Sequence, residues 1–283
     1  MEKFQVARSK KGQAAPLSAV EPGMYLVTGA NGKLGSEITK FLSEQPGVNV
    51  IAAGRSLERM EESGLRNLRN TQCVILDYKD LTGLTQFLST KGKLKGVVHC
   101  EGTYGEIGEL GSLDIKNWIE KFSEITTRIL GLIQVSKLLA ERDGHISLVF
   151  LSGGGATEAY AGLSNYSVMK TALVRIIETA SLEIESTVMS LNALGPGATD
   201  SAMVDQILES EIQLDSRIIN ASNQLRFERK GVSPRVFSSL SYLLSSGGRF
   251  LSGNFYSAEW DDWEKIKVSQ SPNFRLRRLI PPE

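Results

Sequence analysis

The sequence predicts an α/β fold: one doubly wound domain with a central parallel sheet of about seven strands and helices on both faces. Two observations predict it. Short β-branched runs alternate with longer amphipathic stretches, which is the pattern of a parallel sheet covered by helices. A glycine-rich turn, Thr28-Gly-Ala-Asn-Gly-Lys-Leu-Gly35, joins the first strand to the first helix within one βαβ unit of about 30 residues. We therefore expect a Rossmann-type domain.

The expected elements follow in order along the chain. Strands are expected at residues 24–28, 48–53, 72–76, 96–100, 147–151, 188–194 and 253–257. Helices are expected at residues 34–43, 81–89, 118–141, 165–183 and 235–244, the last with Ser233 as N-cap and Pro234 at its first position. Residues 200–231 interrupt this pattern with charges of both signs. Since ligands bind beyond the carboxyl ends of the strands, this insert is either a lid or an ordinary surface pair of helices.

Composition sets the domain organisation and excludes some partners. Residues 24–283 show no linker-like shift, so we expect one domain with a C-terminal tail at 258–283. Residues 1–23 are polar, and we expect a flexible N-terminal arm, with packing on a partner subunit as the alternative. Lysine plus arginine equals aspartate plus glutamate at 32 each, so no overall charge recruits nucleic acid or an anionic membrane.

The chain also lacks the patterns of membrane and metal proteins. It has no run of about twenty apolar residues, and residues 1–22 lack the apolar core of a secretory signal. Cys73 and Cys100 are expected to be free thiols, which suits a reducing, cytoplasmic compartment. Cys100 adjoins His99, but His145 is the only other histidine, so no metal site is predicted.

The glycine-rich turn is the candidate cofactor site. Gly29, Gly32 and Gly35 permit a tight turn and bring backbone N–H groups to a phosphate at the positive end of the helix. A lone glycine triplet is weak, but the strand before it and the helix after it supply the required context. Asn31, Lys33 and Leu34 complete this part of the site.

The end of the second strand favours one cofactor over another. NAD enzymes usually place a carboxylate there for the ribose 2′-hydroxyl, whereas this chain has Arg55 and Ser56. The arginine can pair with a 2′-phosphate and the serine can donate to it, so NADP(H) is preferred and NAD(H) is possible. After the third strand, Asp77 and Tyr78 lie where an adenine ring would lie; Asp77 can accept from the exocyclic amine or cap the next helix.

A tyrosine and a lysine form the candidate catalytic pair. Tyr166 and Lys170 are four residues apart in Tyr-Ser-Val-Met-Lys, so their side chains share one face of a helix. A free phenol has a pKa of about 10, and a neighbouring cation lowers it toward the working range of a proton-transfer group.

Together these residues resemble the short-chain dehydrogenase/reductase family, as an atypical member. The resemblance covers nearly everything after Pro22 and adds a serine after the fifth strand and Asn192-Ala-Leu-Gly-Pro-Gly-Ala-Thr199 after the sixth. It implies that Tyr166 is the general acid/base, that Lys170 holds the nicotinamide ribose and that Ser152 stabilises the substrate oxygen. It further implies that Pro196, Gly197 and Thr199 contact the nicotinamide end.

The chain departs from the family pattern in several places. The usual Asn-Asn-Ala-Gly after the fourth strand is His99-Cys-Glu101-Gly102, which leaves His99, Glu101 and Gly102 as cofactor-binding candidates. Ser152 stands fourteen residues before Tyr166, one more than is commonest. The helix that normally supplies a catalytic asparagine to a water-linked proton relay has Thr127 and Arg128 as its nearest equivalents.

The expected function is interconversion of a carbonyl and an alcohol on a small molecule by hydride transfer. Two alternatives stay open: an epimerase or dehydratase of nucleotide sugars, favoured by the glycine spacing, and a non-catalytic NADP-binding regulator, favoured by the altered fourth-strand motif. The resemblance also implies a homodimer or homotetramer, with helices 118–141 and 165–183 at the main interface.

Overall fold

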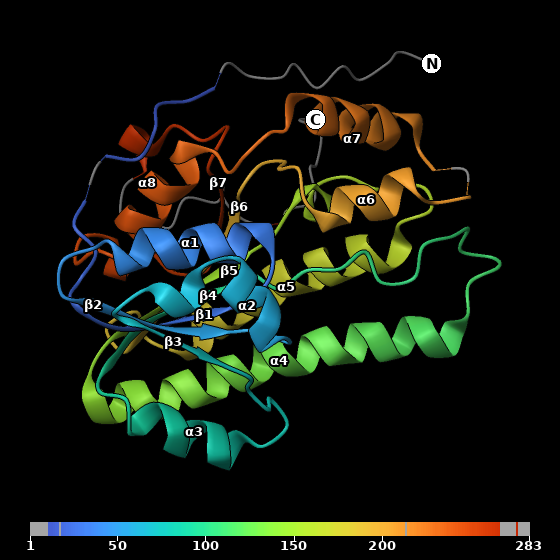
Figure 1. Ribbon diagram of the computed structural model, residues 1–283. Helices are drawn as coiled ribbons and strands as arrows, with labels where there is room; N and C mark the ends of the chain where they lie inside the picture. The colour runs from blue at the N-terminus through green and yellow to red at the C-terminus, as the bar shows by residue number, and fades with distance from the viewer. Residues whose placement is uncertain (1–10, 17, 213, 267–275, 277–283) are drawn as a thin grey trace, which may run out of the picture.

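The computed structural model describes residues 11–16, 18–212, 214–266 and 276. Its centre is a seven-stranded sheet in the order β3-β2-β1-β4-β5-β6-β7, with every neighbouring pair parallel (Figure 1). The strands are β1 (Gly23–Thr28), β2 (Val48–Ala53), β3 (Thr71–Val74), β4 (Leu94–His99), β5 (Ile146–Leu151), β6 (Met189–Gly195) and β7 (Asn254–Ser257). The predicted doubly wound parallel sheet is confirmed. The strand order reverses between β1 and β4, where such folds bind nucleotides.

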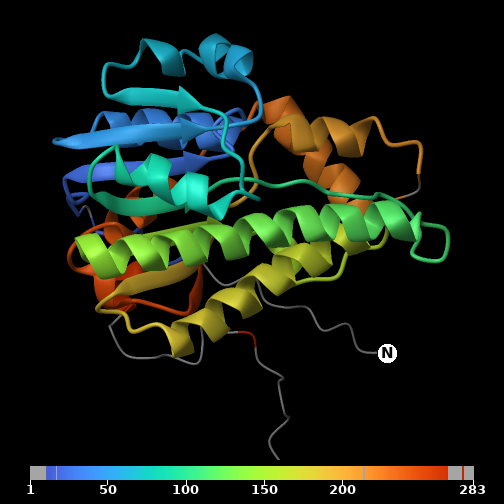
Figure 2. The ribbon, with the colours of Figure 1, turned by 90° about the horizontal axis from the view of Figure 1, so that it is seen from below.

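Helices cover both faces because strand side chains alternate between them. On one face, α1 (Lys33–Ser43) and α8 (Pro234–Leu243) pack against Tyr25 and Val27 of β1. On the other, α3 (Leu81–Ser89), α4 (Ile115–Asp143) and α5 (Ser164–Glu183) pack against Leu26 and its neighbours. Both views show α4 and α5 running side by side (Figures 1 and 2). Each fully buried aliphatic side chain contributes about 1.5–3 kcal/mol to this core.

Element ends differ from the predictions where local capping decides them. The third strand ends at Val74 rather than at residue 76, because its pairing with β2 ends at the Ala53–Val74 pair. Ile75, the next residue, is 61% exposed. The fourth helix begins at Ile115, three residues before the predicted start, because the Asp114 carboxylate accepts from two N–H groups of the first turn. A short helix, α2 (Leu57–Glu62), was not predicted; the Ser56 side chain caps it.

Residues 200–231 form two helices, α6 (Ala202–Leu208) and α7 (Ser216–Glu228), which lie together at one side of the sheet (Figures 1 and 2). Arg226 of α7 forms ion pairs with Asp200 and Asp205 and so ties the two ends of the insert together.

The described part of the predicted flexible arm is packed against the body of the protein. Ala15 and Val20 are buried in the same cluster as Trp263. The Gly12 N–H donates to the Trp260 carbonyl, and the Trp263 N–H donates to Gln13. The burial of these two apolar side chains explains why this part of the arm is attached. The prediction of a flexible arm considered only the polar composition of the segment and did not include this contact. Residues 1–10 and 17, and most of the tail beyond residue 266, lie outside the described residues.

No helix in the described ranges is long and apolar enough to cross a membrane.

Candidate active site

The glycine turn after β1 has the close contacts that require glycine. Gly29 has a φ of +71°, and a Cβ there would lie 2.9 Å from the Glu101 nitrogen. A Cβ on Gly35 would lie 2.2 Å from the Gly29 carbonyl oxygen, so α1 packs directly on the turn. Helix α1 begins after Gly32 without a side-chain cap, which leaves its first N–H groups available. These groups and the helix dipole fit the pyrophosphate of a dinucleotide.

Asn31 joins this turn to the end of β2. Its side chain donates to the Ser56 carbonyl and accepts from the Arg55 N–H. Arg55 is exposed, and its guanidinium forms no ion pair with any residue that the structure describes. Lys33 is also exposed and pairs with Glu37 at 3.7 Å. Two cations therefore flank the turn, and one of them is unpaired within the described ranges.

Asp77, after β3, was expected either to accept a hydrogen bond from the adenine amine or to cap the next helix. Asp80, not Asp77, caps α3 by accepting from the Gly83 N–H at 2.9 Å. Asp77 is exposed, and one of its oxygens accepts from the Lys79 N–H at 2.8 Å, which leaves the second oxygen available. Tyr78 turns toward the sheet, where its hydroxyl donates to Glu101 at 3.0 Å.

Glu101 belongs to a charged cluster that the sequence did not reveal. Arg128 of α4 donates to Glu101 and to Glu124, and its guanidinium lies 5.4 Å over the Tyr78 ring. Burial, reinforced by Glu101, raises the pKa of Tyr78, so this phenol stays protonated and donates. A carboxylate that follows a buried strand is stable only when a positive charge is paired with it. The position of Glu101 directly after β4 is therefore a feature of the sequence from which a cationic partner such as Arg128 could have been predicted.

Tyr166 packs directly against the loop that follows β5. A Cβ on Gly153 would lie 2.4 Å from the phenol oxygen, and one on Gly155 would lie 2.7 Å from the ring. Ser152 is 6% exposed, and its hydroxyl has no hydrogen-bond partner among the described residues. A 3-10 turn at Gly154–Ala156 occupies this longer loop.

The protonation of the candidate pair differs from the sequence expectation. Burial, reinforced by Tyr104 and Tyr160, raises the pKa of Tyr166, which is opposite to the expected direction. The Lys170 ammonium donates to the Leu151 carbonyl at 2.9 Å. Burial lowers the pKa of Lys170 to about 8.

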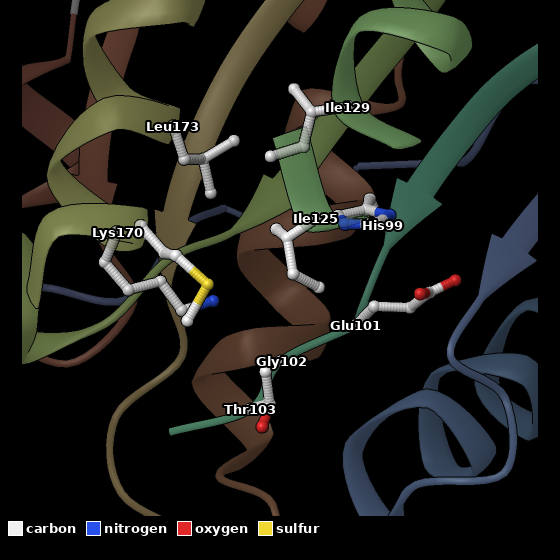
Figure 3. Close-up of a pocket in the computed structure, with 9 residues that line it drawn as sticks. His99, Glu101, Gly102, Thr103, Ile125, Ile129, Lys170 and Leu173 are labelled. Atoms are coloured by element: carbon white, nitrogen blue, oxygen red, sulfur yellow. The ribbon is translucent and has the colours of Figure 1, made fainter. Parts of the chain in front are cut away.

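The wall of the cavity beside Lys170 that α4 contributes is apolar. It is lined by Ile125 and Ile129 (Figure 3). Of the two nearest equivalents of the family's asparagine, Thr127 is exposed and Arg128 pairs with Glu101.

His99 forms another wall of the cavity. It is 1% exposed, and its Nδ1 lies 2.7 Å from the Thr28 hydroxyl. Gly102 is close to the lysine as well, since a Cβ there would lie 3.7 Å from its Nζ.

The turn after β6 contacts the C-terminal segment. Pro196 is buried, Thr199 is half-buried, and Gly197 has a φ of +80°. A Cβ on Gly197 would lie 2.8 Å from Cγ of Glu259, a residue that pairs with Lys11 at 2.6 Å. Glu259 is therefore a neighbour of this turn that no sequence motif indicated.

The insert contacts the candidate catalytic tyrosine. Leu163, Ile207 and Leu214 form a buried cluster against which Tyr104, Tyr160 and Tyr166 pack, together with Ile107, Ile218 and Ile219. Helices α6 and α7 therefore border the phenol through apolar side chains.

The structure thus gathers the predicted residues at one edge of the sheet, in two halves. The turns after β1, β2 and β3 carry the first half, and the turns after β4, β5 and β6 with helix α5 carry the second. No group of three or more His, Cys, Asp or Glu in the described part of the chain is placed to hold a metal ion.

A dinucleotide-binding α/β fold with a serine, a tyrosine and a lysine around one strand end defines a class of oxidoreductases. The sequence model of the short chain dehydrogenase family matches residues 24–212. The chain therefore belongs to this family of NAD(P)-dependent dehydrogenases and reductases.

Known proteins similar to the chain agree with this assignment. It is 23% identical over 237 residues to dehydrogenase/reductase SDR family member 4 of Oryctolagus cuniculus, covering 81% of this chain and 88% of that protein. It is 24% identical over 238 residues to 3-oxoacyl-(acyl-carrier-protein) reductase FabG of Rickettsia felis, covering 81% and 91%.

Solved structures show the same fold. The oxidoreductase yciK from E. coli superposes with a TM-score of 0.72 at 20% identity, covering 87% of this chain and 99% of the other. A short chain dehydrogenase from Shigella flexneri 2a, complexed with NADP, superposes with a TM-score of 0.70 at 20% identity, covering 86% and 99%.

Proposed function

We propose that this protein is a cytoplasmic, NADP(H)-dependent oxidoreductase that interconverts a carbonyl and an alcohol on a small molecule, with Tyr166 as general acid/base. The observation that carries the proposal is the arrangement after β5. The Ser152 hydroxyl is buried without a partner among the described residues, and the Tyr166 phenol packs on the loop that follows it. A substrate oxygen placed between the two hydroxyls would satisfy Ser152 and receive a proton from Tyr166.

The residues of this chain have separate tasks in that reaction. The bound cofactor supplies or accepts the hydride. Tyr166 gives its proton to the carbonyl oxygen in reduction and takes it back in oxidation, and the raised pKa keeps it protonated for the first direction. Ser152 donates a hydrogen bond to the same oxygen. The apolar residues of the insert, Ile207 and Leu214, exclude water from the phenol, which makes the insert a lid.

Arg55 supports NADP(H) over NAD(H). It is exposed at the end of β2, where the backbone is held by Asn31, and no described residue pairs with it. A guanidinium binds a phosphate through two parallel hydrogen bonds. The Shigella flexneri protein of the same fold, which was complexed with NADP, is consistent with this preference.

Parallel calorimetric titrations with NADPH and NADH test the cofactor assignment. We expect NADPH to bind more tightly, and Arg55→Ala to weaken NADPH binding at least about tenfold, or 1.4 kcal/mol, without changing NADH binding. Arg69→Ala is the control, because Arg69 precedes β3 rather than following β2. Preference for NADH, or an equal effect of both variants, would contradict the role of Arg55.

Turnover tests the reaction. A screen of carbonyl substrates with NADPH should give activity that Tyr166→Phe abolishes while cofactor binding persists. Activity that survives Tyr166→Phe would contradict the assignment of the general acid.

A second function is favoured by one observation. The Lys170 ammonium donates to the Leu151 carbonyl, and no hydrogen bond joins it to the Tyr166 hydroxyl in the described part of the chain; this arrangement suits a non-catalytic NADP-binding regulator. Tight NADPH binding without turnover of any carbonyl or alcohol would support this alternative.

We also propose that copies of the chain associate through α4 and α5. Leu130 and Leu138 of α4 and Val168 and Leu182 of α5 are exposed by 42–74%. Large exposed apolar side chains on adjacent helices are typical of an interface between subunits.

A further inference from the structure

The turn that follows β6, the Gly197 turn (residues 196–199), forms few hydrogen bonds of its own. None of the N–H groups of residues 197–199 donates to a residue that the structure describes. Just before the turn, the Gly195 carbonyl accepts from the Ala258 N–H at 2.9 Å, which fixes the C-terminal segment against the end of β6. A loop with so few bonds keeps its shape through the side chains that pack against it.

Glu259 is the side chain that packs against this turn. Its Cγ would lie 2.8 Å from a Cβ on Gly197, which has a φ of +80°. Glu259 is 7% exposed, and its Oε1 has no hydrogen-bond partner among the described residues. Burial raises the pKa of Glu259, but nearby hydrogen bonds and cations, Lys11 first among them, outweigh burial and lower it. The carboxylate is therefore charged near pH 7, and a buried carboxylate needs a cation beside it.

The cation is Lys11, from the N-terminal arm. Its ammonium donates to Oε2 of Glu259 at 2.6 Å, and the lysine side chain is 57% exposed. The next residue of the arm packs tightly, since a Cβ on Gly12 would lie 2.4 Å from the Asp262 nitrogen. The arm and the C-terminal segment therefore meet backbone to backbone beside the ion pair.

Arg235 of α8 fastens these two segments together. Its guanidinium donates to the carbonyls of Ala258 at 2.7 Å, Gln13 at 3.1 Å and Asp261 at 3.3 Å. The fixed fork of N–H groups in an arginine suits such a junction of several carbonyls. The ion pair of the arm is thus held in place from a helix of the main body.

Both ends of the insert meet at the same place. The Asp200 N–H donates to the Lys230 carbonyl at 2.8 Å, which closes the insert at its base. The Gly197 turn leads directly into this base, and the insert contacts Tyr166 through its apolar side chains. A shift of the turn would therefore also move the insert over the candidate active site.

We propose that Glu259 is a positioning residue that supports the Gly197 turn, and that Lys11 holds Glu259 in place. The inference rests on the proposed function, because this turn is the one expected to contact the nicotinamide end of the cofactor. It gives the N-terminal arm a part in the cofactor site, exerted through Glu259. Loss of the ion pair should loosen the nicotinamide end and leave the adenosine end, at the turns after β1 and β2, unchanged.

Hydrogen exchange of the full-length protein without cofactor tests the support of the turn. We expect Lys11→Met to raise the exchange rate of peptides that cover residues 196–201 about threefold, since one member of the pair is exposed. Gly12→Ala, which displaces the arm but keeps both charges, should raise it as well. Lys11→Arg keeps the charge and should leave it unchanged. Wild-type exchange in both Lys11→Met and Gly12→Ala would overturn the inference.

Calorimetry with two ligands tests the effect on the cofactor site. NADPH is compared with 2′-phospho-ADP-ribose, which carries the adenosine end without the nicotinamide ring. We expect Lys11→Met to weaken NADPH binding about threefold and to leave binding of 2′-phospho-ADP-ribose unchanged. A general loss of structure would weaken both ligands alike. Equal losses, or an unchanged affinity for NADPH, would refute the positioning role.

Lys265→Met is the matched control. Lys265 pairs with Asp262 at 2.8 Å in the same C-terminal segment, but its side chain is 83% exposed. This variant should change neither the exchange of the turn nor the binding of either ligand, and an effect equal to that of Lys11→Met would contradict the inference. Failure of the proposed function is a separate result: the wild type would then bind neither ligand, and the exchange rates alone would decide whether Glu259 and Lys11 support the turn.

Discussion

The ion pair between Arg128 of α4 and Glu101, which follows β4, is expected to contribute to the free energy of unfolding. The two side chains are 17% and 11% exposed. Arg128→Met keeps most of the side-chain volume but leaves the Glu101 carboxylate with only the Tyr78 hydroxyl as a described partner. An uncompensated carboxylate in such a place is expensive, whereas an exposed pair contributes little.

The magnitude follows from this burial. Breaking a fully buried pair costs about 3–5 kcal/mol, and an exposed one about 0–1 kcal/mol. This pair is mostly buried, and the Tyr78 hydroxyl compensates part of the charge, so we expect Arg128→Met to lose about 2–3 kcal/mol. Adding Glu101→Gln removes the stranded charge, so the double variant should lose about 1–2 kcal/mol less than the sum of the singles.

Equilibrium unfolding in urea at pH 7, followed by tryptophan fluorescence, measures these losses. Lys137→Met is the control on the same helix, because Lys137 and Glu141 form a pair that is 47% and 52% exposed. It should change stability by no more than about 0.5 kcal/mol. An Arg128→Met loss no larger than that of the control, or additive single and double variants, would refute the argument.

Three further predictions concern the candidate site and the interface. Gly153→Ala meets no backbone strain at a φ of −176°, but its Cβ would lie 2.4 Å from the Tyr166 oxygen. We therefore expect kcat to fall about 100-fold with NADPH binding retained. Gly231→Ala is the control and should have no effect, because no atom lies within 4 Å of the added Cβ. Lys170 has a pKa lowered from 10.5 to about 8, so its burial costs stability fully below pH 8 and not above about pH 10.5. Lys170→Met should therefore stabilise the protein by about 1–3 kcal/mol at pH 7, with the gain vanishing as unfolding is measured through that range; a gain that is independent of pH would contradict this. Leu130→Asp with Leu138→Asp should reduce the mass measured by light scattering to that of a monomer, whereas Phe227→Asp, on α7 and 90% exposed, should not.

The sequence predicted best what short stretches of chain determine. The glycine turn was predicted because Gly29 requires a positive φ and Gly35 a close approach, and both requirements are local. The parallel sheet, covered by helices on both faces, followed from the alternation of strands and helices. These features made the fold and the placement of Asn31 and Arg55 accessible without a structure.

The environment of each side chain was less predictable, because it depends on elements distant in sequence. The spacing of Tyr166 and Lys170 was sound, but the direction of the phenol's pKa depends on burial against Tyr104 and Tyr160. The face that α4 turns to the site depends on its packing against α5. The face of α4 that lines the cavity carries Ile125, two residues before Thr127, and Ile129, one residue after Arg128.

The contact between Lys11 and Glu259 has a consequence for how the protein is made. The two residues are 248 positions apart, and their neighbours form backbone hydrogen bonds across the same gap. Contacts so distant in sequence close late in folding, after the entropy of a long loop has been lost. During synthesis the β1–α1 half can assemble early, since domains form from the N-terminus onward. The Gly197 turn, which packs on Glu259, gains this support only after residue 259 has left the ribosome.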